Sequence, residues 1–205
     1  MASKKRGKRA KRRMVRRSTN RPADKLSTPA NKVRMKVVGV GGAGGNVIMR
    51  MEEGIRGVNF VAINTDVQDL DKSETRNKIH IGKILTRGMG AGMNPEMGKM
   101  AADESRLEIS EALKDTDMVF LTAGFGGGTG SGAAPVVAEI AKELGALTVG
   151  VVTKPFAFEG AERMRIADEA IARIKDKVDA LLVIPNDRIF SIIDNDTSMV
   201  KAFEK

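Results

Sequence analysis

The chain has 205 residues, no cysteine, tryptophan or tyrosine, and a formal net charge of +9. This length predicts one globular domain, and the lack of cysteine excludes a disulfide framework and is typical of a reducing, cytoplasmic compartment. No apolar run approaches the ~20 residues that cross a bilayer, and the basic start lacks the apolar stretch of a secretory signal. We therefore expect an internal, soluble protein.

The positive charge is confined to the start of the chain. Residues 1–34 contain fourteen Lys or Arg and one acid, Asp24, whereas the other 171 residues hold 21 bases and 25 acids. With so few apolar side chains, residues 1–33 are predicted to be a disordered basic tail. Such a tail suits a nucleic acid or an anionic membrane, and a transit peptide or a merely solubilising extension are the alternatives.

From residue 34 onward, short β-rich runs alternate with helical periodicity. Strands are expected at 36–40, 58–63, 78–81, 118–122, 147–152 and 180–184. Helices are expected at 45–53, 95–113, 133–144, 159–177 and 187–193, the second beginning after an N-cap at Asn94. This alternation predicts an α/β fold: a Rossmann-like parallel sheet with helices on both faces, whose ligands bind at the carboxyl ends of the strands.

The first glycine-rich motif follows the first expected strand. Gly39–Gly44 reads G-x-G-x-x-G, and an acid, Asp66, ends the next strand. Such glycines let backbone N–H groups approach a phosphate at a helix amino end. Taken alone, the motif also fits an NAD-dependent oxidoreductase, which is the competing hypothesis.

The second motif, at 124–132, has six glycines in nine residues and lies between a strand and a helix. It lacks the Lys of a P-loop, so backbone N–H groups would hold the phosphates. Four or five charge-assisted hydrogen bonds, each worth ~1.5–3 kcal/mol, suffice for the ~8 kcal/mol of micromolar binding. A side chain at Gly128 is expected to block the phosphate while leaving the fold intact.

The run Gly-Gly-Gly-Thr-Gly-Ser-Gly at 126–132 resembles the signature loop of the tubulin/FtsZ superfamily. Its surroundings resemble the FtsZ branch, the bacterial cell-division GTPases, more than tubulin. The similarity covers about residues 34–205, and its matching stretches are 40–46, 64–66, 88–96, 123–135, 153–160 and 184–188.

The resemblance implies a GTP/GDP site and assigns a role to each matching position. Its residues are Gly41, Gly42, Ala43, Gly44, Gly45 and Asn46 under the diphosphate; Ala91, Gly92 and Met93 at the γ-phosphate; Gly126, Gly127, Gly128, Thr129 and Gly130 around the α- and β-phosphates; Asn64 and Pro155 beside these loops; Glu159 and Arg163 at the ribose; Asn186 and Phe203 at the guanine; and Asp66 near Mg²⁺ and the γ-phosphate.

Several of these residues also have an ordinary structural interpretation. Asp66 could be only a helix N-cap, and Glu159 with Arg163 only an i,i+4 surface pair. Asn186 could be a turn residue and Phe203 a core residue. The single histidine, His80, is expected on the outer face of a short strand, without a catalytic role.

The resemblance also implies what lies beyond this sequence. Lys205 falls early in the family's long central helix, so 34–205 is expected to be a GTP-binding domain without the second domain. In the complete protein, head-to-tail filaments would hydrolyse GTP at subunit interfaces, in the cytoplasm at the division site and with division-site proteins as partners. The chain alone is expected to bind GTP but to hydrolyse it poorly, with no catalytic residue of its own.

Deleting residues 1–33 is expected to abolish polyanion binding and to leave nucleotide binding unchanged, because the rest of the chain is net negative. If five to ten basic residues contact phosphates, log affinity should fall against log salt with a slope of about −4 to −9. Fluorescence titrations with DNA and with anionic vesicles measure this. Absence of binding to both at low salt would contradict any partner for the tail.

Overall fold

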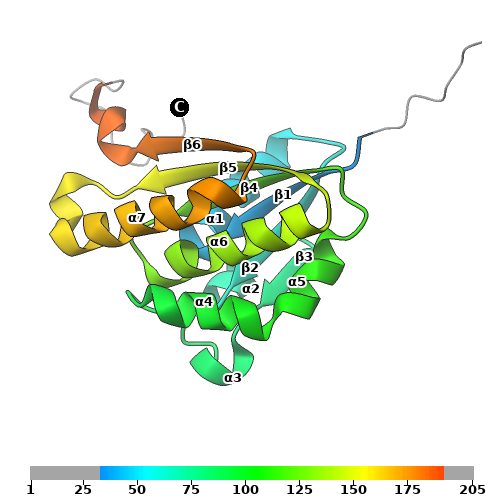
Figure 1. The fold of residues 1–205 in the computed structure, drawn as a ribbon, viewed down its shortest axis with the longest axis horizontal. Helices are drawn as coiled ribbons and strands as arrows, with labels where there is room; N and C mark the ends of the chain where they lie inside the picture. The colour runs from blue at the N-terminus through cyan, green and yellow to red at the C-terminus, as the bar shows by residue number, and fades with distance from the viewer. Residues whose placement is uncertain (1–32, 192–205) are drawn as a thin grey trace, which may run out of the picture. The chain divides into compact units, whose positions relative to one another are not determined.

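The computed structural model describes residues 33–191, which contain a six-stranded, all-parallel sheet (Figure 1). The strands lie in the order β3-β2-β1-β4-β5-β6. Their bounds are β1 Met35–Val40, β2 Asn59–Asn64, β3 Asn77–His80, β4 Met118–Gly124, β5 Leu147–Lys154 and β6 Ala180–Pro185. The predicted Rossmann-like α/β class is confirmed.

The strand order reverses between β1 and β4. From β1 the chain proceeds outward to β2 and β3, and it then returns to β4 and proceeds to β5 and β6 on the other side. Because right-handed crossovers in opposite directions lie on opposite faces, the connections after β1 and β4 diverge. In such sheets the usual ligand position is the carboxyl edge at this point of reversal.

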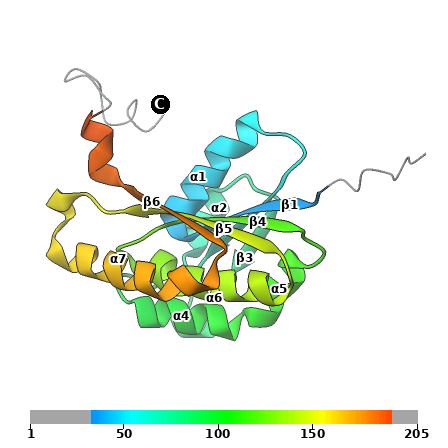
Figure 2. The same cartoon turned by 45° about the horizontal axis from the view of Figure 1, so that its top comes forward.

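The helices cover the two faces unequally (Figure 2). One face carries α1 and α2, whose Ile48 and Leu70 pack on Val37, Phe60 and Ala62 of the sheet. The larger core lies on the other face, beneath α4, α5, α6 and α7. The helix bounds are α1 Gly41–Gly54, α2 Val67–Lys72, α3 Lys83–Thr86, α4 Pro95–Glu104, α5 Arg106–Leu113, α6 Gly128–Glu143 and α7 Ala161–Ile174, with 3₁₀ turns η1 Ala157–Glu159, η2 Lys175–Lys177 and η3 Asn186–Ser191.

Helix α6 is the centre of the larger core. Twelve of its sixteen residues are buried, and many are Gly, Ala or Ser. These small side chains let α4 pack directly on α6. An added Cβ at Gly132 would lie 2.0 Å from the Pro95 carbonyl oxygen, and one at Gly98 would lie 2.3 Å from the Gly128 carbonyl oxygen. The α4–α6 contact is therefore backbone against backbone.

Several predicted element boundaries were wrong. Helices α1 and α6 begin at Gly41 and Gly128, four and five residues earlier than predicted. The predicted helix over 95–113 is divided at Ser105, whose hydroxyl accepts a hydrogen bond from the Gly82 N–H at 3.3 Å. Because serine side chains readily form hydrogen bonds that compete with those of the helix backbone, serine favours such a break.

Other differences concern short elements and one strand. Helices α2 and α3 were not predicted, and the helix expected from residue 159 begins at Ala161, after a separate 3₁₀ turn. Strand β5 is only partly buried on one side, and its first residue, Leu147, is 50% exposed. None of the helices between residues 33 and 191 is long and apolar enough to cross a bilayer.

Replacing Gly132 with Ala should lower the free energy of unfolding by about 2 kcal/mol, because the new methyl group overlaps backbone atoms of α4 that cannot turn aside. Helix propensity alone would predict the opposite sign. Gly54→Ala is the matched control, since a Cβ there meets no atom within 4 Å. Urea denaturation compares the two variants, and an unchanged midpoint for Gly132→Ala would contradict the close α4–α6 packing.

Candidate functional site

The predicted site residues within the described part of the chain gather at the carboxyl edge of the sheet. Because the strands are parallel, the segments after β1, β2, β4, β5 and β6 all start at this edge. These segments contain Gly41–Asn46, Thr65 and Asp66, Phe125–Gly130, Pro155–Glu159 and Asn186. Phe203 lies outside the described residues, so its predicted stacking on the base stays a prediction.

Helices α1 and α6 both begin at this edge without a side-chain cap. Helix α1 follows Val40 and α6 follows Gly127, and neither helix has an acid in its first turn. By contrast, Asp66 caps α2 and Asn94 caps α4 by accepting hydrogen bonds from backbone N–H groups. First-turn N–H groups lack acceptors within their own helix and lie at its positive end. The amino ends of α1 and α6 can therefore receive an anion.

The two uncapped ends meet at the point where the strand order reverses. Gly41 has a left-handed φ of +73°, and an added Cβ would lie 3.1 Å from the Gly130 nitrogen. A side chain at Gly41 would thus separate the two helix starts. The glycine pattern thus brings two positive helix ends side by side at the carboxyl edge of the sheet.

The loop over residues 87–94 is joined to both neighbouring segments. The Gly128 N–H donates to the Gly92 carbonyl at 2.7 Å, and the Val67 N–H donates to the Gly88 carbonyl at 3.1 Å. The hydroxyls of Thr65 and Thr129 lie 2.7 Å apart. Thus the loop predicted at the γ-phosphate does lie beside the glycine-rich start of α6.

The glycines of the site divide into two groups. An added Cβ would lie within 2.8 Å of backbone oxygens at Gly44, Gly128 and Gly130, whereas at Gly45 and Gly127 it would meet nothing within 4 Å. At Gly44, Gly128 and Gly130 the lack of a side chain lets two backbone segments come into contact, whereas Gly45 and Gly127 face open space. The expectation that a side chain at Gly128 spares the fold was therefore wrong.

Asp66 is a helix N-cap, and its geometry also leaves room for a second role. Its Oδ1 atom accepts hydrogen bonds from the Gln68 and Asp69 N–H groups at 2.9 and 3.2 Å. Its Oδ2 atom lies 3.6 Å from the position of an added Cβ at Gly90, toward the loop over residues 87–94. Residues 33–191 contain no group of three His, Cys, Asp or Glu suited to a metal. Because Mg²⁺ often takes one carboxylate together with substrate phosphates, Asp66 fits that use.

On the β5 side, Glu159 is held by two partners within the chain. Its Oε1 accepts a hydrogen bond from the Phe156 N–H at 2.8 Å, and its Oε2 pairs with Arg163 at 3.0 Å. The predicted pair is confirmed, although Glu159 lies in η1 and not in α7. Asn186 begins η3, and its neighbour Asp187 accepts a hydrogen bond from the Ala157 N–H at 3.2 Å.

An aromatic cluster in the same region was not predicted. The ring centroids of Phe156 and Phe158 are 4.9 Å apart, and those of Phe156 and Phe190 are 5.4 Å apart. His80 ends β3 with its Nε2 atom buried and without a hydrogen-bond partner among the described residues. His80 is half-buried.

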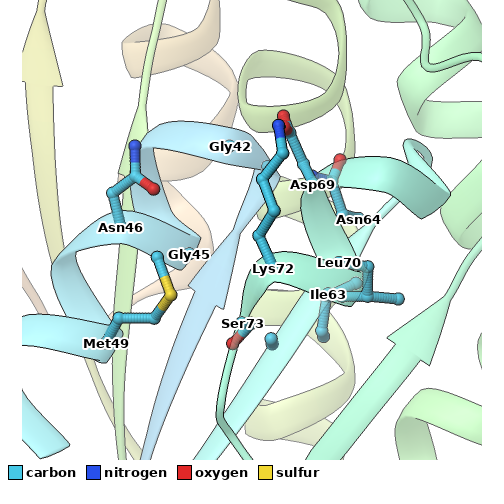
Figure 3. Close-up of a pocket in the computed structure, with 12 residues that line it drawn as sticks. Gly42, Gly45, Asn46, Met49, Ile63, Asn64, Asp69, Leu70, Lys72 and Ser73 are labelled. Atoms are coloured by element: carbon cyan, nitrogen blue, oxygen red, sulfur yellow. The ribbon is translucent and has the colours of Figure 1, made fainter.

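A cavity of about 90 Å³ lies between α1 and α2 (Figure 3). It is lined by Gly41, Gly42, Gly45, Asn46, Met49, Ala62, Ile63, Asn64, Asp69, Leu70, Lys72 and Ser73. The contribution of α2 to this cavity was not predicted from the sequence, although a helix N-cap was one interpretation of Asp66. The signal was present: an N-cap residue followed three positions later by an acid, Asp69, is a helix start.

Comparison with known proteins shows the family of this chain. The chain matches the GTPase domain of the tubulin/FtsZ family over residues 34–194, and it belongs to this family.

The solved structures that are similar to this chain include an FtsZ and two CetZ proteins. A structure of an empty FtsZ dimer from M. jannaschii shares 54% sequence identity with a TM-score of 0.80, covering 84% of this chain and 50% of that chain. The GDP-bound CetZ1 monomer from Haloferax volcanii shares 28% identity with a TM-score of 0.74, over 84% of this chain and 56% of that one. A GTPγS-bound protofilament of CetZ2 from the same organism shares 27% identity with a TM-score of 0.74, over 84% and 54%. The chain thus spans about half the length of these relatives.

Replacing Thr129 with Val should lower the free energy of unfolding by ~1–3 kcal/mol, because the hydroxyl of the fully buried Thr65 loses the partner that the structure gives it. The double variant Thr65→Val/Thr129→Val should recover most of this loss, since both polar groups are then removed together. Thermal and urea denaturation measure the cycle. Additive losses in the double variant would contradict the hydroxyl pair.

Proposed function

We propose that this chain binds GTP and GDP, with the phosphates at the amino ends of α1 and α6. The observation that carries the proposal is the meeting of two helix starts, both without a side-chain cap and without first-turn acids, at the reversal of the strand order. Family membership and the GDP-bound relative support the same ligand.

The site differs from what an NAD-dependent oxidoreductase needs. A dinucleotide fold uses one glycine-rich helix start, the one after its first strand. Here a second start, at Gly128, lies beside the first, and the loop over residues 87–94 is bonded to it. A chain of phosphates with its terminal group toward that loop makes use of all three segments.

The roles of single residues follow from this placement. Backbone N–H groups of Gly42, Ala43 and Thr129 would hold the α- and β-phosphates, and Ala91, Gly92 and Met93 the γ-phosphate. Asp66 would hold Mg²⁺ together with phosphate oxygens, and the ion would neutralise phosphate charge. Glu159 and Arg163 would contact the ribose, and Asn186 the guanine.

The activity and partners of the whole protein are part of the same proposal. We infer a cell-division GTPase that assembles head to tail into filaments, in the cytoplasm at the division site. The relatives described as a dimer and as a protofilament support assembly. The proposed binding of division-site proteins, and of nucleic acid or anionic membrane by residues 1–33, rests on the sequence alone, since that tail lies outside the described residues.

Isothermal titration calorimetry should show binding of GDP and GTP. ATP and NADH should bind about tenfold more weakly, which corresponds to a difference in binding free energy of about 1.4 kcal/mol.

Gly127→Gln should weaken GDP binding by about tenfold at unchanged stability, because its side chain enters the open space before α6. Gly54→Gln, at another open glycine far along α1, is the control and should bind as the unaltered chain does. Tight NADH binding without GDP binding would overturn the proposal.

A further inference from the structure

A carboxylate from α2 lies at the amino end of α1. An added Cβ at Gly42, in the first turn of α1, would lie 3.1 Å from the Oδ2 atom of Asp69. Figure 3 shows the Asp69 side chain directed toward Gly42 across the cavity. Although α1 has no cap of its own, a negative charge from another helix therefore lies at its positive end.

One lysine faces this carboxylate. The Nζ atom of Lys72 lies 3.0 Å from Asp69 Oδ1, and both side chains line the cavity (Figure 3). The hydrogen bond with Asp69 raises the pKa of Lys72 above its ordinary value, with smaller contributions from the charges of Asp69 and Asp66. Lys72 thus remains protonated and offsets the charge of Asp69.

The carboxylate of Asp69 would weaken the binding of an anionic ligand at this helix end. A phosphate bound at the first turn of α1 would share that position with the carboxylate of Asp69, and like charges at such distances repel each other. The repulsion falls as Lys72 neutralises Asp69, and it rises with the charge on the ligand. Asp69 is 46% exposed and Lys72 is 71% exposed, so salt should screen both effects.

We propose that Asp69 and Lys72 set the nucleotide affinity of this chain through their charges: Asp69 opposes the phosphates and Lys72 relieves that opposition. The inference rests on the proposed function, which supplies the anionic ligand. Asp69 and Lys72 are affinity-setting residues at the edge of the phosphate site. A nucleotide whose charge Mg²⁺ has partly neutralised would be less sensitive to them than the free nucleotide.

The test measures binding of GDP and GMP without Mg²⁺ to four variants, by calorimetry at 50 and 500 mM NaCl. Asp69→Asn should bind GDP about 3- to 10-fold more tightly than the unaltered chain, and Lys72→Gln should bind it more weakly by a similar factor. The double variant should bind like Asp69→Asn, since Lys72 acts through Asp69. The changes should be smaller for GMP and at high salt.

Asp71→Asn is the matched control, because it removes the same charge from the same helix but does not line the cavity. Equal tightening by Asp71→Asn and Asp69→Asn would overturn the inference, since net charge alone would then explain it. Unchanged or weaker GDP binding by Asp69→Asn, at an unchanged melting temperature, would also overturn it. If Asp69→Asn fails to fold, unchanged GDP binding by Lys72→Gln decides against the inference. Failure of the unaltered chain to bind GDP would instead contradict the proposed function.

Discussion

The N–H groups at the amino ends of α1 and α6 are the constraint on which the arrangement of this site depends. Helix starts leave backbone donors without acceptors in their own helix, and such donors need partners. The strand order places these two starts side by side, at Gly41 and Gly130. Their neighbours α2 and α4 begin with caps from Asp66 and Asn94, whereas the first-turn N–H groups of α1 and α6 have no side-chain acceptor. An anionic ligand would accept hydrogen bonds from these N–H groups.

Much of this arrangement could be predicted from the sequence. Alternating strands and helices determine the parallel sheet, and a parallel sheet brings its carboxyl ends to one edge. The glycine motifs then had to lie together. The helix starts were predicted too late because glycine is a poor helix former in isolation. At Gly44 and Gly130, contact with the backbone of β4 outweighs that preference, and the helix extends back to its first glycine.

Contacts between distant parts of the chain were beyond sequence reasoning. Thr65 and Thr129 are 64 positions apart, and nothing in either local pattern indicates their pairing. The same holds for Asp69 and Gly42, which meet only because α1 and α2 cover the same face of the sheet. Sequence periodicity predicts which face of a helix or strand is buried. It does not predict which residues of two different elements come into contact.

The close contacts of the glycines affect how mutagenesis of this family's signature loop is interpreted. At Gly128, Gly130 and Gly132 a methyl group would strike backbone atoms of the chain itself. A variant at these positions can lose its ligand because the helix has moved, with no ligand contact removed. Loss of nucleotide binding by such a variant is therefore evidence about the ligand contact only when its stability has also been measured. At Gly45 and Gly127 an added Cβ meets no atom within 4 Å, so loss of binding there reports on the ligand directly.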